Sequence, residues 1–90
     1  METRDLRLDG NAIGGLLLEV FGLDLTAAPS VCGSCGSRQE VARLDVYVNA
    51  PGVVVRCCRC QAVMMRIVQG RGRTWLDLSG TGCLELGELG

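Results

Sequence analysis

Cysteines are the residues of this 90-residue chain whose type and spacing can do chemistry. Four of them form two Cys-x-x-Cys pairs, Cys32 with Cys35 and Cys57 with Cys60, with 21 residues between the pairs. Two residues between ligands let a chain form a tight turn, or knuckle, in which both sulfurs point at one metal ion and backbone N–H groups hydrogen-bond to them. Two knuckles complete a tetrahedral S₄ site. The sequence therefore predicts one structural Zn²⁺ bound by these four cysteines.

Other chemistries fit the same pairs less well. Iron in the same S₄ geometry would make the chain a rubredoxin-like electron carrier, an alternative that ligand geometry alone does not separate from zinc. A redox-active dithiol needs only one pair beside a βαβ pattern, and that pattern is missing. The chain has no histidine, and four cysteine ligands leave no open coordination position for an activated water. We therefore expect no enzymatic activity and no small-molecule substrate.

Cys58 and Cys83 are left outside the predicted ligand set. Cys58 paired with Cys60 would leave one residue between the two sulfurs, which makes a poorer knuckle. Cys83 stands in a glycine-rich segment, where a small, semi-buried apolar role is expected.

Length and composition indicate one small domain over residues 1–90 with help from a metal. Hydrophobic residues make up 48% of the chain and aromatic residues 3%, so the core must consist mostly of aliphatic side chains. A chain of this length buries only about 60–65% of its unfolded surface, and such domains often need a metal, disulfides or a partner. All nine basic residues are arginine, a bias typical of GC-rich bacterial genomes.

The amino terminus and the apolar runs predict a cytoplasmic protein with no membrane association. The opening METRDLRLDG lacks the basic start and apolar stretch of a secretory signal. The apolar runs, such as Leu16 to Leu18, are far shorter than the roughly 20 residues that span a bilayer. In a reducing cytoplasm, paired cysteines are metal ligands or redox groups more often than disulfides.

Apolar periodicity predicts one N-terminal amphipathic helix over residues 9–22. Asp9 suits the N-cap, apolar residues follow at spacings of three and four from Ile13 to Phe21, and Gly22 suits the C-terminal stop. Such a short helix needs an apolar surface to pack on, which a sheet can supply.

Two antiparallel hairpins are predicted within the cysteine region, residues 31–78. The first joins strands at 43–48 and 53–56, and the second joins strands at 63–68 and 73–78. One cysteine pair precedes each hairpin. The predicted fold class is thus a small metal-bound α+β domain, a zinc ribbon of two hairpins and two knuckles with one helix. Residues 79–90 are predicted to form an acidic, glycine-rich, loosely attached tail.

The predicted hairpins also define a candidate partner face. Residues 31–75 carry seven arginines against two acidic residues, while both ends of the chain are acidic. Arginines that alternate with aromatic residues can contact phosphates and stack on single-stranded bases. The candidate residues are Arg43, Tyr47, Arg56, Arg66, Arg73 and Trp75.

The interpretation we favour for this face is nevertheless an ordinary solvated surface. It pairs Arg43 and Arg73 with Asp45 or Asp77 and packs Trp75 beneath the helix. The sequence pI of about 5.2 also argues against strong duplex binding, for which a domain pI above about 9 is usual. The apolar helix is a second candidate surface, for a protein partner, although packing on the domain's own sheet accounts for it.

Segments along nearly the whole chain resemble a family of short uncharacterised bacterial proteins that carry a domain of unknown function. The resemblance lies in DGNAIGGLLLEVFGLDLT, CGSCG, YVNAPGVVVRCCRCQAVMMRIV and RTWLDLSG. It implies a zinc-ribbon-like fold and a bacterial origin, without an established activity. Where Cys58 stands, many such sequences have what looks like a proline.

Together these observations predict a non-catalytic binding or adaptor module with a structural Zn(Cys)₄ site. Its partner is expected to be a protein or a single-stranded nucleic acid.

Overall fold

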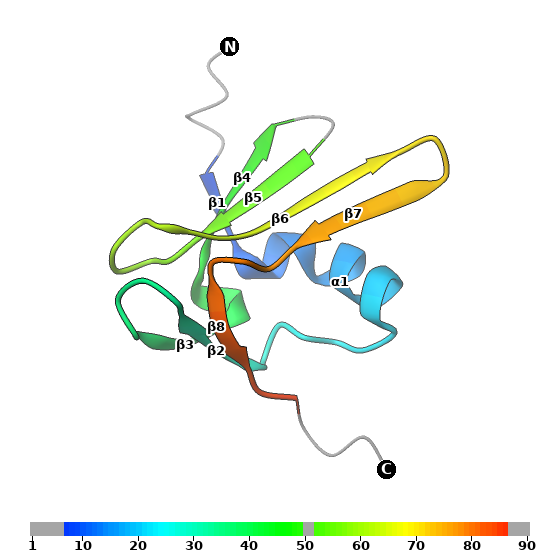
Figure 1. Ribbon diagram of the computed structural model, residues 1–90. Coiled ribbons are helices and arrows are strands. Elements are labelled where there is room, and N and C mark those ends of the chain that lie inside the picture. The colour runs from blue at the N-terminus through cyan, green and yellow to red at the C-terminus, as the bar shows by residue number, and fades with distance from the viewer. Residues whose placement is uncertain (1–6, 50–51, 87–90) are drawn as a thin grey trace.

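The computed structural model describes residues 7–49 and 52–86, which form a small α+β fold with two antiparallel sheets. The larger sheet has five strands in the order β1-β4-β5-β6-β7, and the smaller has three in the order β3-β2-β8. Figure 1 shows the large sheet across the upper part of the view, with α1 and the small sheet below it. The prediction of one helix combined with antiparallel sheets is confirmed for the described residues.

The chain runs from the large sheet (β1) to the small sheet (β2, β3), returns to the large sheet (β4 to β7) and ends in the small sheet (β8). The helical elements are η2 (Gly10–Ile13) and η3 (Val41–Arg43), both 3-10 helices, and the α-helix α1 (Gly14–Phe21). The strands are β1 (Arg7–Asp9), β2 (Pro29–Cys32), β3 (Arg38–Glu40), β4 (Asp45–Asn49), β5 (Gly52–Arg56), β6 (Val63–Gly70), β7 (Arg73–Asp77) and β8 (Thr81–Leu84).

The N-terminal helix is shorter than predicted. Asp9 does not cap it, because the backbone of Asp9 pairs with Asp45 in the large sheet, and the α-helix begins only after the 3-10 turn η2. Leu17 is buried, as its apolar spacing predicts. Gly22 ends the helix in a left-handed conformation, and its N–H donates to the Leu18 carbonyl at 2.7 Å.

Strand alternation places the core on one face of the large sheet. Val46, Val55 and Met65 lie in register on β4, β5 and β6, and each is at most 3% exposed. Side chains at alternate positions of a strand share a face, so the residues between them point away from the core. The buried core consists of Ile13, Leu17, Leu25, Cys32, Val41, Leu44, Val46, Val55, Cys57, Met64, Met65 and Ile67.

The two predicted hairpins are neighbours in one sheet. β4 pairs with β5 and β6 pairs with β7, but β5 also pairs with β6, from Gly52 opposite Val68 to Arg56 opposite Val63. The second cysteine pair lies between β5 and β6, and the register shifts at Arg56 where the chain leaves the sheet. The second cysteine pair is therefore held at the edge of the core by two central strands.

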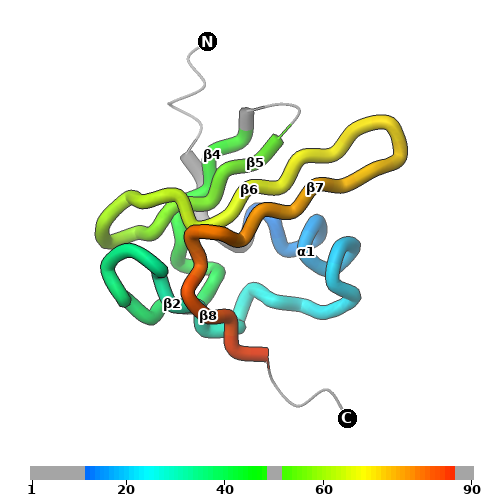
Figure 2. Tube along the Cα trace, in the orientation of Figure 1, coloured from blue at the N-terminus to red at the C-terminus, as the bar shows by residue number. Residues whose placement is uncertain are grey.

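The predicted loosely attached tail is in part a strand of the small sheet. β8 pairs with β2, and the Glu85 N–H donates to the Pro29 carbonyl at 2.8 Å. The Thr81 hydroxyl donates to the Met64 carbonyl at 2.9 Å. Figure 2 traces the passage from β7 (orange) to β8 (red), which carries the chain from the large sheet to the small one. The expectation of a loose tail is therefore wrong for residues 81–85, while residues 87–90 lie outside the described part.

Within residues 7–49 and 52–86, none of the helices has both the length and the apolar character needed to cross a membrane.

Candidate metal centre

Four cysteine sulfurs meet where the two sheets come together. Cys32 ends β2 of the small sheet, Cys57 directly follows β5 of the large sheet, and Cys35 and Cys60 lie three residues further on. All four sulfur atoms lie within 4.8 Å of one another. The structure thus brings together the four residues that the sequence predicts as metal ligands, and such a group could hold a metal ion.

Two of the distances between the sulfurs match those around a tetrahedral ion. The Sγ atoms of Cys32 and Cys60 are 3.7 Å apart, and so are those of Cys35 and Cys57. A tetrahedral zinc with Zn–S bonds of about 2.3 Å requires its sulfurs to lie about 3.8 Å apart. A disulfide needs about 2.05 Å, so these four cysteines are free thiols.

Backbone amides point at one sulfur in each pair. Cys32 Sγ accepts from the N–H groups of Ser34 at 3.3 Å and Cys35 at 3.5 Å. Cys57 Sγ accepts in the same way from Arg59 at 3.3 Å and Cys60 at 3.5 Å. Hydrogen bonds of this kind spread the charge of a thiolate, so both turns are arranged for a negatively charged sulfur.

The two turns also close with the same backbone hydrogen bonds. The Gly36 N–H donates to the Cys32 carbonyl at 3.0 Å, and the Gln61 N–H donates to the Cys57 carbonyl at 3.0 Å. The first cysteine of each pair donates its own N–H five residues ahead, to Ser37 or Ala62, at 2.9 Å. The two Cys-x-x-Cys pairs, which repeat in the sequence, thus form turns with the same backbone hydrogen bonds.

Burial and the amides act differently on the thiols of the first pair. The Cys35 N–H, joined by the Ser34 N–H and by neighbouring thiols, lowers the pKa of Cys32 to about 7 despite the burial of that side chain. The Ser37 N–H lowers the pKa of Cys35, but desolvation and the thiols of Cys60, Cys57 and Cys32 together raise it to about 11. Within the first pair, the thiolate is therefore favoured at Cys32, which accepts two amide hydrogen bonds, over Cys35.

Cys58 and Cys83 lie outside the four-sulfur cluster. Cys58 is half-buried within the second turn, and Cys83 is exposed on β8, opposite Val31 of β2.

Gln61 is a residue of the second cysteine turn that sequence reasoning missed. It has a φ of 65°, and its side-chain amide donates to Asp45 Oδ2 at 2.5 Å and to the Cys57 carbonyl at 3.1 Å. The Tyr47 hydroxyl donates to its Oε1 at 3.1 Å. Arg56 Nη1 donates to its backbone carbonyl at 2.8 Å. Gln61 follows the second pair as Gly36 follows the first, and this equivalence was the signal in the sequence.

The structure places most of the candidate partner face together. Tyr47, Arg56, Arg66, Arg73 and Trp75 share the face of the large sheet opposite the core, as the pairing registers require. Arg43 is the exception, because it lies in η3 and approaches Glu40 at 3.9 Å.

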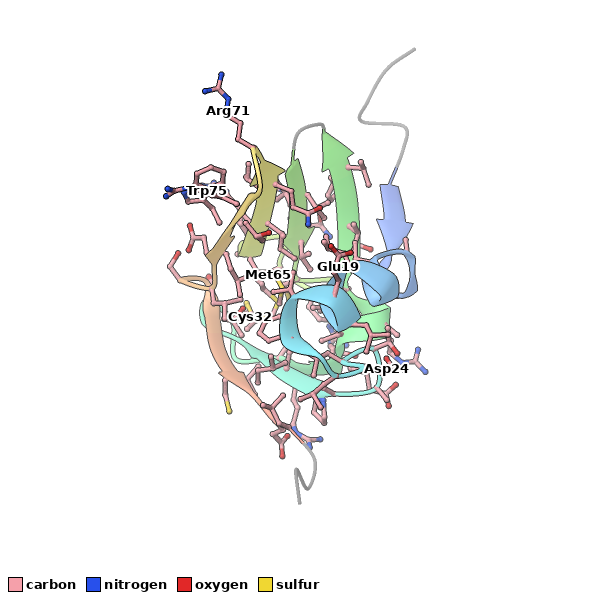
Figure 3. The ribbon with its side chains drawn as sticks, turned by 90° about the vertical axis from the view of Figure 1, so that its right-hand side faces the viewer. Glu19, Asp24, Cys32, Met65, Arg71 and Trp75 are labelled. Carbon is pink, nitrogen blue, oxygen red and sulfur yellow. The ribbon has the colours of Figure 1, made fainter. Side chains whose placement is uncertain are left out.

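The favoured interpretation of this face is wrong in its contacts. Trp75 is 55% exposed and projects from β7 on the side away from α1, as Figure 3 shows, so it does not pack beneath the helix. Asp45 accepts from Gln61, and Asp77 accepts from the Ser79 N–H at 2.9 Å. Within residues 7–49 and 52–86, the ion pairs are Arg38–Glu85 and Arg43–Glu40, and neither involves Asp45 or Asp77.

Comparison with known proteins gives a family. No curated protein and no solved structure matches the chain. A family of unknown function matches residues 2–88, which is nearly the whole chain. The chain therefore belongs to the DUF6510 family, a family of unknown function.

Proposed function

We propose that the chain is a non-catalytic zinc-ribbon binding module in which one structural Zn²⁺ is held by Cys32, Cys35, Cys57 and Cys60. The observation that carries the proposal is the pair of 3.7 Å sulfur–sulfur distances in a cluster whose two turns aim amides at their first sulfur. The turns serve as knuckles, and the β4–β5 and β6–β7 pairs serve as the ribbon's hairpins.

The donor set supports a structural role for the metal. Four thiolates fill a tetrahedral shell, and catalytic zinc sites keep one position for water or substrate. Cys32 and Cys57 are buried and Cys35 and Cys60 are exposed, so the ion would lie between the core and the surface, with all four coordination positions filled by sulfur.

The position of the cluster supports a role for the metal in holding the fold together. Cys32 belongs to β2 and Cys57 follows β5, so an ion bound to both joins the small sheet to the large one. Structural zinc contributes about 10–16 kcal/mol of apparent binding free energy. A domain of this size has a total stability of about 5–15 kcal/mol. We therefore expect the metal-free protein to be largely unfolded.

A reducing compartment such as the cytoplasm suits this function, because oxidation of the four thiols would destroy the ligand set. The module's partner is a protein or a single-stranded nucleic acid.

Elemental analysis of protein purified without added metal tests the proposal, combined with circular dichroism before and after strong chelation. The expected result is one zinc per chain, a colourless protein and loss of the β-sheet spectrum on chelation, with recovery when zinc is returned. One iron per chain with a red colour would instead identify an electron carrier. An unchanged spectrum after complete metal removal would overturn the structural role.

A further inference from the structure

We propose that the face of the large sheet turned away from α1 binds single-stranded nucleic acid, with a base stacked on Trp75 and phosphates held by Arg66 and Arg73. This inference deepens the proposed function and rests on it, since it names the partner of the binding module.

The pairing of β6 with β7 brings these three side chains together. Trp75 is in register with Val68, and Arg66 lies two residues before Val68, on the same face. Arg73 lies two residues before Trp75 on β7, again on that face. Residues two apart on a strand are about 7 Å apart, so both guanidinium groups can reach a strand whose base covers the indole.

The side chains of this cluster are free to meet a ligand. Trp75, the only tryptophan of the chain, is 55% exposed although a small core would gain from burying it. Arg66 and Arg73 are exposed, and the ion pairs of the described residues use neither of them. Asp77, opposite Arg66, accepts from the Ser79 N–H; the Ser79 hydrogen bonds and the Arg66 charge lower the pKa of the Asp77 carboxyl, so Arg66 has a carboxylate beside it but no direct ion pair.

Tyr47 and Arg56, the other members of this face, are held in place by Gln61 of the second cysteine turn. Tyr47 is in register with Val54, which is in register with Arg66, so one row of side chains crosses the sheet. The Arg56 guanidinium lies 5.8 Å from the centre of the Tyr47 ring. Gln61 binds both residues, through the Tyr47 hydroxyl and the Arg56 guanidinium. A preorganised ring and guanidinium lose little conformational entropy when a second base or phosphate binds.

The chemistry of the face favours a nucleic acid over a protein. Among the side chains that the structure describes on β4 to β7 of this face, three arginines stand against two aspartates, and Trp75 is the one large hydrophobic side chain that is mostly exposed. Large exposed apolar patches mark protein-docking surfaces, whereas on the described part of this face Arg66 and Arg73 lie among the apolar side chains. Guanidinium groups beside an exposed indole match alternating phosphates and bases, and the bases are accessible only in a single strand.

The test is a titration of the zinc-loaded protein with fluorescently labelled oligo(dT) and oligo(U), followed by anisotropy and by quenching of the Trp75 emission. We expect binding that weakens with salt, quenching of the single tryptophan, and much weaker binding to a duplex. Trp75→Ala should weaken binding about 5- to 150-fold, the range for loss of one stacked base. Trp75→Phe should restore most of the affinity.

Charge variants locate the binding to this face. Arg66→Gln and Arg73→Gln should each weaken binding and each lower the salt slope by about 0.7, the value for one phosphate contact on a single strand. Arg43→Gln is the matched control, because it removes the same charge from η3, off the face. Equal weakening by Arg43→Gln and Arg66→Gln would overturn the proposal, as would the absence of binding or of tryptophan quenching.

Zinc content and circular dichroism of the same samples distinguish failure of the nucleic-acid proposal from failure of the zinc-module proposal. A folded protein with one zinc that fails to bind would refute the nucleic-acid face and leave the zinc module standing. A protein that folds without metal would refute the zinc module itself, whatever it binds.

Discussion

Gln61 occupies in the second cysteine turn the place that Gly36 occupies in the first, and both residues have a positive φ, 65° and 77°. Each donates its N–H to the carbonyl of the first cysteine of its pair at 3.0 Å. Glycine adopts this backbone conformation without strain, whereas a residue with a Cβ atom pays about 1–2 kcal/mol. The hydrogen bonds of the Gln61 side chain compensate for that cost and connect the turn to β4.

Substitution of Gln61 separates backbone strain from side-chain contacts. Gln61→Ala loses the hydrogen bonds and keeps the strain, while Gln61→Gly loses the bonds and relieves it. We expect the free energy of unfolding of Gln61→Ala to be lower than that of Gln61→Gly by about 1 kcal/mol. Denaturant unfolding at a fixed free zinc concentration measures the difference.

Gly36→Ala is the control for this comparison, because no atom lies within 4 Å of the added Cβ and only the backbone is strained. It should cost about 1–2 kcal/mol. Equal stability of Gln61→Ala and Gln61→Gly would contradict the presence of backbone strain at residue 61.

Gly80 is predicted to be the glycine least tolerant of a side chain. A Cβ atom there would stand 1.9 Å from the Val63 carbonyl oxygen, where the chain passes from β7 to β8 against the start of β6. Because backbone on both sides must move, Gly80→Ala should destabilise the protein by at least about 3 kcal/mol. Gly70→Ala, in open space on the same strand as Val63, should stay within about 0.5 kcal/mol. Thermal unfolding of the zinc-loaded proteins compares them, and similar melting temperatures would refute the close approach.

Serine substitutions distinguish the ligand cysteines from the other two. Cys58→Ser and Cys83→Ser should each retain one zinc per chain, because neither sulfur belongs to the cluster. Cys60→Ser should lose most of the zinc and with it the folded spectrum, since the alcohol is a poor replacement for a thiolate ligand. Zinc stoichiometry after gel filtration is the measurement. Loss of zinc in Cys58→Ser would place Cys58 among the ligands instead.

Thr81 tests whether the segment after β7 belongs to the folded body. Thr81→Val keeps the shape of the side chain and leaves the Met64 carbonyl without its hydroxyl donor, so it should cost about 1 kcal/mol or somewhat more. Thr74→Val, at an exposed position of β7, should change stability by less than about 0.5 kcal/mol. Denaturant unfolding compares the two, and an equal effect would show that β8 adds little to the fold.

Local sequence patterns by themselves determine the two cysteine turns and the faces of the strands. The two-residue spacing of each cysteine pair predicts its turn, because a knuckle is formed by six consecutive residues and their own backbone hydrogen bonds. Alternation over 43–48 and 73–78 predicts which side chains leave the core, because the period of a strand is a property of its backbone. Burial of Val46 and exposure of Trp75 and Arg73 both follow from it.

Only the tertiary structure decided which strands pair with each other and which face of the sheet the helix covers. Pairing of β5 with β6 merged two expected hairpins into one sheet, and pairing of β8 with β2 turned an expected tail into a strand. Asp9 joined β4 instead of capping the helix, and α1 covered the opposite face of the sheet from Trp75. Each outcome depends on contacts between segments far apart in the chain, whose energies compete with local preference and leave no periodic signal in the residues themselves.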